Sequence, residues 1–111
     1  MTTILFLYVI AGLLLTGLSI PLILGIVKPN PLYGFRVQQT LDNPQVWYAV
    51  NKYSGKRLLA AGIITIVAAV GFYFIPGISL DAYALACLGV TGTALAIGIV
   101  QSFLYLKKVA K

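Results

Sequence analysis

The chain has 111 residues, of which 60% are hydrophobic and only 9% are charged, and its formal net charge is +6. A soluble domain carries about 25% charged residues, so this composition belongs to the integral membrane class, and the length allows one small bundle. The sequence has no His and a single Cys, Cys87, which excludes a metal cluster of the usual ligands and an intrachain disulfide. We therefore expect no metal and no cofactor, and we interpret Cys87 as a small packing residue.

The first predicted element is an uncharged run over residues 3–27, which is long enough to cross the roughly 30 Å hydrocarbon core of a bilayer as a helix. No Lys or Arg precedes this run, and it is longer than the apolar part of a signal peptide, so we expect a retained transmembrane helix. Pro21 removes one backbone donor from the helix interior. This predicts a kink between Gly17 and Pro21, where Ser19 offers a compensating hydrogen bond.

A polar and aromatic connector follows over residues 28–57. Pro29 and Pro31 should end the first helix, because a residue that precedes proline is pushed toward extended geometry. Gly34 then allows backbone conformations that are closed to other residues, so its neighbours are expected to point in different directions over a short distance: Tyr33, Phe35 and Arg36.

The second half of the connector predicts a short helix over residues 44–54. Asp42 or Asn43 is a suitable N-cap, and Pro44 fits the first turn. Gly55 is placed to end the helix. The apolar side chains recur at spacings of three and four: Val46, Trp47, Val50 and Tyr53. This pattern predicts a helix in the interfacial plane with its Trp in the headgroup layer, although a helix folded back onto the bundle has the same pattern.

Two further uncharged runs predict the remaining spans, over residues 58–75 and 82–106. The connector between them is brief, so the two helices should lie antiparallel and side by side. The sequence therefore predicts an all-α membrane protein, a single domain over residues 1–111 with three transmembrane helices. A cytoplasmic loop that contains the short interfacial amphipathic helix joins helices 1 and 2.

The last span carries two stripes of small residues on nearly opposite helix faces. One stripe comprises Ala82, Ala86, Gly89, Thr93 and Ala96, and the other comprises Ala84, Cys87, Thr91, Ala94 and Gly98. Small residues let helices approach closely in lipid, so we expect both stripes to be packing faces with a neighbour on each side. We interpret these neighbours as the first and second spans, with a partner chain on one face as the alternative.

The basic residues predict the topology. With three spans, the connector over residues 28–57 and the C-terminal tail lie on one side and hold all 8 Lys and Arg residues, while Asp81 lies on the other side. The positive-inside rule then places the N-terminus outside and the C-terminus in the cytoplasm, in a bacterial cytoplasmic or other internal membrane.

Basic residues that flank the spans are expected to contact anionic lipid headgroups, and each contributes about 1 kcal/mol near an acidic surface. They are Lys28, Lys52, Lys56, Arg57, Lys107 and Lys108. Lys111 belongs to the same basic tail. Because these positions face headgroups first, nucleic acid is not an expected partner.

The ionisable residues argue against catalysis and against ion transport. No predicted span contains a charged residue, whereas pumps and ion-coupled transporters usually carry ionisable groups within the membrane. Asp42 and Asp81 lie in connectors on opposite sides, so they cannot form an acid and base pair, and the lack of His excludes a conventional triad. We expect no enzymatic function.

Arg36 stands apart from the residues that flank the spans. Its guanidinium, held by a tight turn, could bind a lipid phosphate, cap helix carbonyls or pair with Asp42. A structural clamp within the loop, made with Asn30, Asn51 or Asp42, is the favoured interpretation over a ligand site.

The loop residues also form a recognisable signature. Its members are Pro29, Asn30, Tyr33, Gly34, Phe35, Arg36, Trp47, Asn51 and Gly55. In order and spacing they resemble the signature of the SdpI family of small bacterial membrane proteins, which commonly has Thr where this chain has Val37. The resemblance implies a three-span core and a non-catalytic role in toxin immunity or membrane signalling.

Three functional hypotheses follow. In the first, an SdpI-like protein acts in immunity or signalling and docks a partner through its cytoplasmic loop. In the second, a small structural or accessory subunit packs through its small-residue stripes onto a larger membrane protein complex. The third, a lipid- or cofactor-binding protein, depends only on the aromatic and basic loop. We expect a membrane protein partner or a homo-oligomer.

Overall fold

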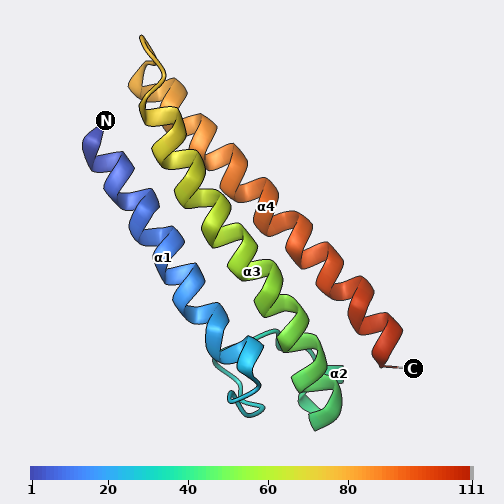
Figure 1. Cartoon of the computed structure of the whole chain (residues 1–111). Coiled ribbons are helices and arrows are strands. Elements are labelled where there is room, and N and C mark those ends of the chain that lie inside the picture. The colour runs from blue at the N-terminus through green and yellow to red at the C-terminus, as the bar shows by residue number, and fades with distance from the viewer. Residues whose placement is uncertain (111) are drawn as a thin grey trace.

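Three long helices lie side by side, and α3 lies between the other two (Figure 1). The computed structural model describes residues 1–110, so Lys111 of the predicted basic tail lies outside the described residues. The elements are α1 (Thr2–Leu24), α2 (Gln38–Leu41), α3 (Pro44–Tyr73) and α4 (Leu80–Val109). The 3 long helices are apolar and long enough to cross a membrane, which confirms the predicted all-α fold with three spans.

The first helix, α1, runs through Pro21 and ends at Leu24 rather than at residue 27. Gly25 follows in the left-handed conformation, with a φ of 71°, and its N–H binds a carbonyl of the last turn. Ser19 Oγ donates to the carbonyl of Thr16 over 2.6 Å. It therefore does not supply the hydrogen bond that is missing because Pro21 has no backbone N–H. The kink itself stays a prediction.

The middle helix, α3, is continuous past the predicted boundary at Gly55. Its start is as predicted, because Pro44 occupies the first turn and Asn43 caps it. The Asn43 side-chain oxygen accepts from the N–H groups of Gln45 and Val46 at 3.0 and 3.3 Å. Gly55 does not end this helix but lies buried in its interior.

Gly55 allows α3 to approach another helix closely instead of ending α3. A Cβ at this position would stand 3.1 Å from both Leu22 Cβ and the Ser19 carbonyl oxygen on α1. The placement of the predicted short helix at residues 44–54 is therefore wrong, since these residues are the first turns of α3. Their apolar face packs on α4 in a buried cluster of Val46, Val50 and Leu106. The short helix of the connector is α2 instead.

Two glycines bring α1 and α3 into backbone contact. A Cβ on Gly12 would stand 2.8 Å from the Gly62 carbonyl oxygen, and a Cβ on Gly62 would stand 2.8 Å from the Gly12 carbonyl oxygen. Thr16 lies in the same contact, and its hydroxyl donates to the Gly12 carbonyl over 2.8 Å. Small residues are the usual means of close helix approach in lipid. This crossing was not predicted, because close packing was expected on the last span.

The last helix, α4, packs on α3 along one of its two small-residue stripes. Thr91 Oγ1 lies 3.0 Å from Thr65 Oγ1, and Cys87 is buried with Ala69 and Tyr83 at the junction. The stripe of Ala84, Cys87, Thr91, Ala94 and Gly98 is therefore the packing face.

The opposite stripe of α4 is open. Ala82, Gly89, Thr93 and Ala96 are exposed and Ala86 is half-buried. α1 lies on the far side of α3 and meets α4 near its own N-terminus, where a Tyr8 hydroxyl donates to the Ala84 carbonyl over 3.4 Å (Figure 1). Within residues 1–110, the interpretation that α1 and α3 cover both stripes is therefore wrong.

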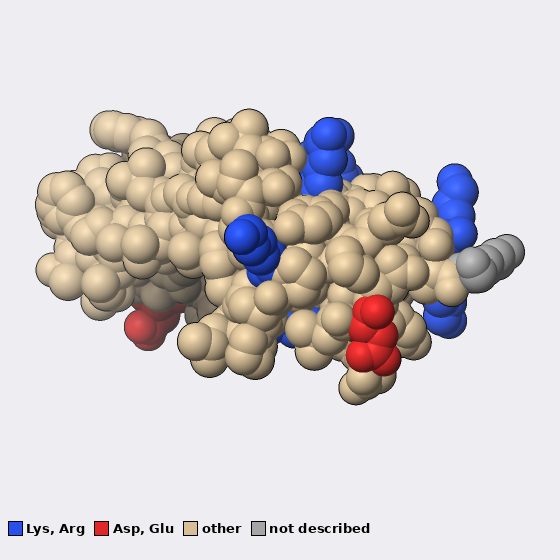
Figure 2. All heavy atoms as spheres, turned by 90° about the horizontal axis from the view of Figure 1, so that it is seen from below, with Lys and Arg blue, Asp and Glu red and all other residues tan. Residues whose placement is uncertain are grey.

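The charged side chains distinguish the two ends of the bundle. Basic residues lie where α1 ends, α3 begins and α4 ends, while Asp81 lies in the first turn of α4 at the other end. On the face drawn in Figure 2, Lys and Arg lie from the middle of the molecule to one end, and none lies toward the other.

Candidate functional site

The loop over residues 28–37 takes its shape from side chains that bind its own backbone. Asn30 uses both ends of its amide. Its Oδ1 accepts from the N–H groups of Leu32 and Tyr33 at 2.9 and 2.7 Å. Its Nδ2 donates to the carbonyls of Lys28 and Tyr33 at 2.8 and 3.1 Å. Both amide donors and the acceptor oxygen are thus engaged in one local turn.

Two buried side chains of α3 hold the loop from below. Trp47 Nε1 donates to the Val27 carbonyl over 2.8 Å, which ties the end of the first span to α3. Asn51 Oδ1 accepts from the Phe35 N–H over 2.5 Å, and its Nδ2 donates to the Trp47 carbonyl over 2.9 Å. Trp47 and Asn51 are at most 2% exposed, so these bonds satisfy loop backbone groups that water does not reach from this side.

Gly34 lets the loop lie directly against those two side chains. Its φ of 116° lies in the region that glycine adopts most readily. A Cβ at this position would stand 2.7 Å from Asn51 Oδ1 and 3.1 Å from Cη2 of Trp47. Both the conformation and the space therefore require glycine here.

We expect Gly34→Ala to lower the free energy of unfolding by about 2 kcal/mol, because it adds backbone strain and a clash with buried Asn51. Gly77→Ala is the matched control, since Gly77 has a positive φ of 74° but no atom within 4 Å of a new Cβ. Thermal unfolding of both variants in detergent measures the difference. An equal loss at the two positions would assign the effect to backbone conformation alone and contradict the clash.

Arg36 binds within the loop, through a partner that was not predicted. Its Nη1 donates to the carbonyl of Pro31 and to none of the three side chains expected as partners. Asp42 accepts instead from Gln38 Nε2, with 2.8 Å to each carboxylate oxygen. The Arg36 side chain is otherwise exposed, so a clamp on the loop and a contact with a partner are compatible.

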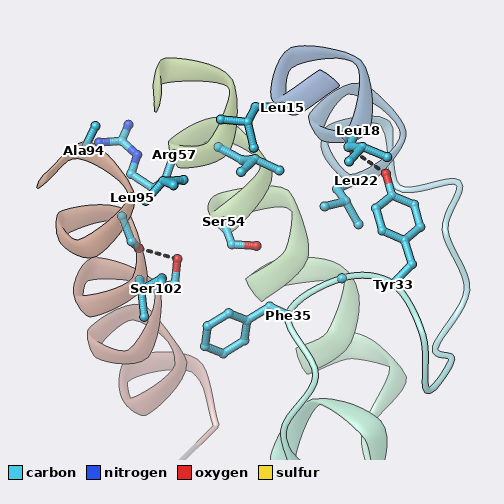
Figure 3. A pocket seen from close by; sticks show the side chains of 14 residues that line it. Leu15, Leu18, Leu22, Tyr33, Phe35, Ser54, Arg57, Ala94, Leu95 and Ser102 are labelled. Atoms are coloured by element: carbon cyan, nitrogen blue, oxygen red, sulfur yellow. Dashed lines mark hydrogen bonds between the residues drawn. The ribbon is translucent and has the colours of Figure 1, made fainter. Parts of the chain in front are cut away.

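A cavity of about 330 Å³ lies beneath the loop, between α1, α3 and α4 (Figure 3). Tyr33 and Phe35 form its wall on the loop side. The helices contribute Leu18, Leu22, Ser54, Leu58, Leu95 and Ser102. The two serine hydroxyls donate to carbonyls of their own helices, at 3.4 and 2.7 Å. Arg57 also lines the cavity, but the rest of the lining is apolar or internally hydrogen-bonded, so most of the cavity is suited to an apolar chain.

Tyr33 closes the cavity on the α1 side, where its hydroxyl donates to the Leu18 carbonyl (Figure 3). Burial raises the pKa of Tyr33 above its ordinary value of 10.0, so the hydroxyl stays a protonated donor at neutral pH. Because the folded-state pKa is raised, the stability that this bond contributes is present at neutral pH and is lost only as the pH rises through the folded-state pKa.

The structure separates the predicted site residues into three groups. The signature residues come together around the loop, with Pro29 half-buried and Gly55 displaced to the α1–α3 contact. The predicted packing residues of α4 lie away from the loop, except that Ala94 and Gly98 line the cavity. The predicted headgroup residues Lys28, Lys52, Lys56, Lys107 and Lys108 are exposed, whereas Arg57 is half-buried.

Several cavity residues were not predicted, and their only sequence signal is a serine within each of two otherwise apolar helix faces, Ser54 and Ser102. Over residues 1–110, no cluster of His, Cys, Asp or Glu side chains is placed to hold a metal ion.

Comparison with known proteins identifies a family whose model covers the loop, α2, α3 and most of α4. The family model described as the SdpI/YfhL protein family matches residues 26–102, which is more than half of the chain. The match confirms the resemblance that the loop signature predicted. No curated protein and no solved structure matches the chain.

Proposed function

Because this chain belongs to the SdpI/YfhL protein family, we propose that it acts without catalysis in toxin immunity or membrane signalling. The loop over residues 28–37 is its docking surface for a protein partner. The basic end of the bundle faces the cytoplasm of a bacterial cell and the N-terminus lies outside, an orientation supported by the gathering of Lys and Arg at that end.

The docking proposal rests on a loop that is fixed from within and exposed at its tip. Leu32 is 84% exposed, and Arg36 nearby is exposed as well. The Asn30 side chain accepts from the Leu32 N–H, and Arg36 donates to the Pro31 carbonyl, so both side chains fix the backbone of the tip. A partner that binds such a preorganised apolar and cationic pair loses little affinity to the ordering of the loop. A connector that only joins two spans needs no fixed tip.

Photo-crosslinking from the loop tip in native membranes tests the docking proposal. A crosslinking amino acid at Leu32 should capture a defined protein, and Arg36→Ala should lower the yield about tenfold by removing the neighbouring charge. The matched control places the same amino acid at Phe74, which is 73% exposed at the opposite end of the bundle. Equal capture from Phe74, or a yield that does not depend on Arg36, would refute docking at the loop.

A second candidate function, a small accessory subunit of a larger membrane complex, is favoured by the open stripe on α4. Ala82, Gly89 and Thr93 are exposed there, and small residues admit another helix closely. In the same experiment, crosslinking to large membrane subunits from Gly89 rather than from Leu32 would favour this candidate over the loop.

A further inference from the structure

Arg57 is a half-buried cation without a counter-ion among the described residues. Its Nη1 lies 3.5 Å from the neutral side-chain oxygen of Gln101, and its buried Nε has no hydrogen-bond acceptor. Asp42 binds Gln38 in the loop, and Asp81 lies in the first turn of α4. At 1.5 Å of rise per residue, each of these two acids is about 20 Å or more along a helix from the level of Arg57.

The surroundings of Arg57 make an unpaired charge unfavourable. A Cβ on Gly98 would stand only 3.2 Å from Arg57 Cβ, so the side chain leaves α3 directly against α4. Gly98 is about 13 Å to the membrane side of Lys107 along α4. The Tyr53 ring, with its centroid 5.5 Å from the guanidinium carbon, compensates part of the charge. Since desolvating an ion is costly, an anion from outside the described chain would stabilise this guanidinium.

An open apolar groove between α3 and α4 shares the wall residue Ala94 with the cavity that Arg57 lines. Its volume is about 610 Å³, and its lining includes Ile64, Ala86, Gly89, Thr93, Ala94 and Ile97. Figure 3 shows the Arg57 side chain at the wall of the cavity beneath the loop, a wall that Ala94 also lines.

Helix register places Arg57 and Gln101 at the basic end of the groove. Ile97 and Ala94 stand one and two turns before Gln101, so the three residues share one face of α4. Ile64 stands two turns after Arg57 on α3, again on the same face. The polar pair is therefore continuous with the apolar lining.

We propose that this groove binds one acidic phospholipid from the leaflet at the basic end of the bundle. The lipid phosphate accepts from the Arg57 guanidinium and from the Gln101 amide, and one acyl chain lies over the small residues of α4. Guanidinium donors match phosphate oxygens in a bidentate geometry, which makes Arg57 the specific contact. The open stripe that was predicted to receive a helix thus receives a lipid chain.

A lipid fits this site better than an acidic side chain of a protein partner. Ile64 and Ile97 are 44% and 51% exposed, so the groove opens onto the apolar surface that lipid covers in a membrane. The Lys and Arg residues behind the net charge of +6 lie toward the same end and also attract acidic lipid. The site lies apart from the loop tip and does not depend on the proposed docking function.

Native mass spectrometry of the detergent-purified protein, titrated with phosphatidylglycerol or phosphatidylcholine, tests the headgroup contact. The wild type should retain phosphatidylglycerol about tenfold better, the effect expected of one charge-assisted hydrogen bond. Arg57→Gln should abolish this preference. Lys56→Gln is the matched control, because Lys56 is the adjacent basic residue but is exposed, and it should keep the preference.

Gly89→Leu tests the acyl chain in a protein whose charges are unchanged. No atom lies within 4 Å of a Cβ at Gly89, so the leucine fills the groove without disturbing the fold and should weaken retention of phosphatidylglycerol. The proposal is overturned if the wild type shows no preference between the two lipids. It is also overturned if Lys56→Gln loses the preference as fully as Arg57→Gln does, if Gly89→Leu retains the lipid unchanged, or if a co-purifying protein occupies the groove in place of lipid.

Discussion

Gly62→Ala is expected to separate α1 from α3 and to lower the free energy of unfolding by about 3 kcal/mol, the upper part of the range for an overpacked site. The added Cβ would stand 2.6 Å from Thr16 Oγ1 and 2.8 Å from the Gly12 carbonyl oxygen. The threonine side chain can rotate, but the carbonyl belongs to the α1 backbone and moves only with the helix. Alanine is the better helix former by up to about 1 kcal/mol, so a net loss in the free energy of unfolding must come from the clash.

Gly71→Ala is the control for this substitution, because Gly71 lies in the same helix with no atom within 4 Å of a new Cβ. It should be neutral or slightly stabilising. Thermal unfolding of the purified variants in the same detergent measures both effects. If Gly71→Ala proved as damaging as Gly62→Ala, the close approach of α1 and α3 would not be what holds the bundle together.

The elements that could be predicted from the sequence depend on local signals. Uncharged runs are enough to identify three spans, and Asn43 with Pro44 is enough to identify the start of α3. Gly55 was misinterpreted because glycine serves equally at a helix end and at a close helix crossing. Only the position of α1, which no local pattern contains, decides between the two.

The residues of the site could be predicted from the sequence, but the groups that they contact could not. The signature identifies Trp47 and Asn51, but they bind backbone groups of Val27 and Phe35, and a side-chain pattern does not show such partners. The cavity was missed because three helices line it, and the spacing of two of them follows from the glycine contact of α1 with α3. Arg57 was grouped with the surface cations because sequence position alone does not show that it lies against α4.

Asn51→Leu is expected to release the loop while the three spans stay in place. Leucine is similar in size, so little packing is lost, but the Phe35 N–H loses its acceptor and the Trp47 carbonyl loses a donor. A shielded polar group left without a partner costs about 1–3 kcal/mol, and with the lost bonds we expect a total destabilisation of roughly 3 kcal/mol. Hydrogen exchange at the Phe35 amide should become fast, while exchange in the middle of α1 and α3 stays slow.

Ser54→Ala provides the comparison one helical turn further along α3. Its hydroxyl makes only a 3.4 Å bond to the Asn51 carbonyl, so its removal should leave the loop in place. If docking requires the shape of the loop, Asn51→Leu abolishes crosslinking from Leu32 although Leu32 and Arg36 are both present, whereas Ser54→Ala preserves it. Slow hydrogen exchange at the Phe35 amide in the Asn51→Leu variant would refute the inference that Asn51 keeps the loop in place. Full crosslinking from a loop shown to be released would instead mean that the partner recognises the tip residues without their fixed geometry.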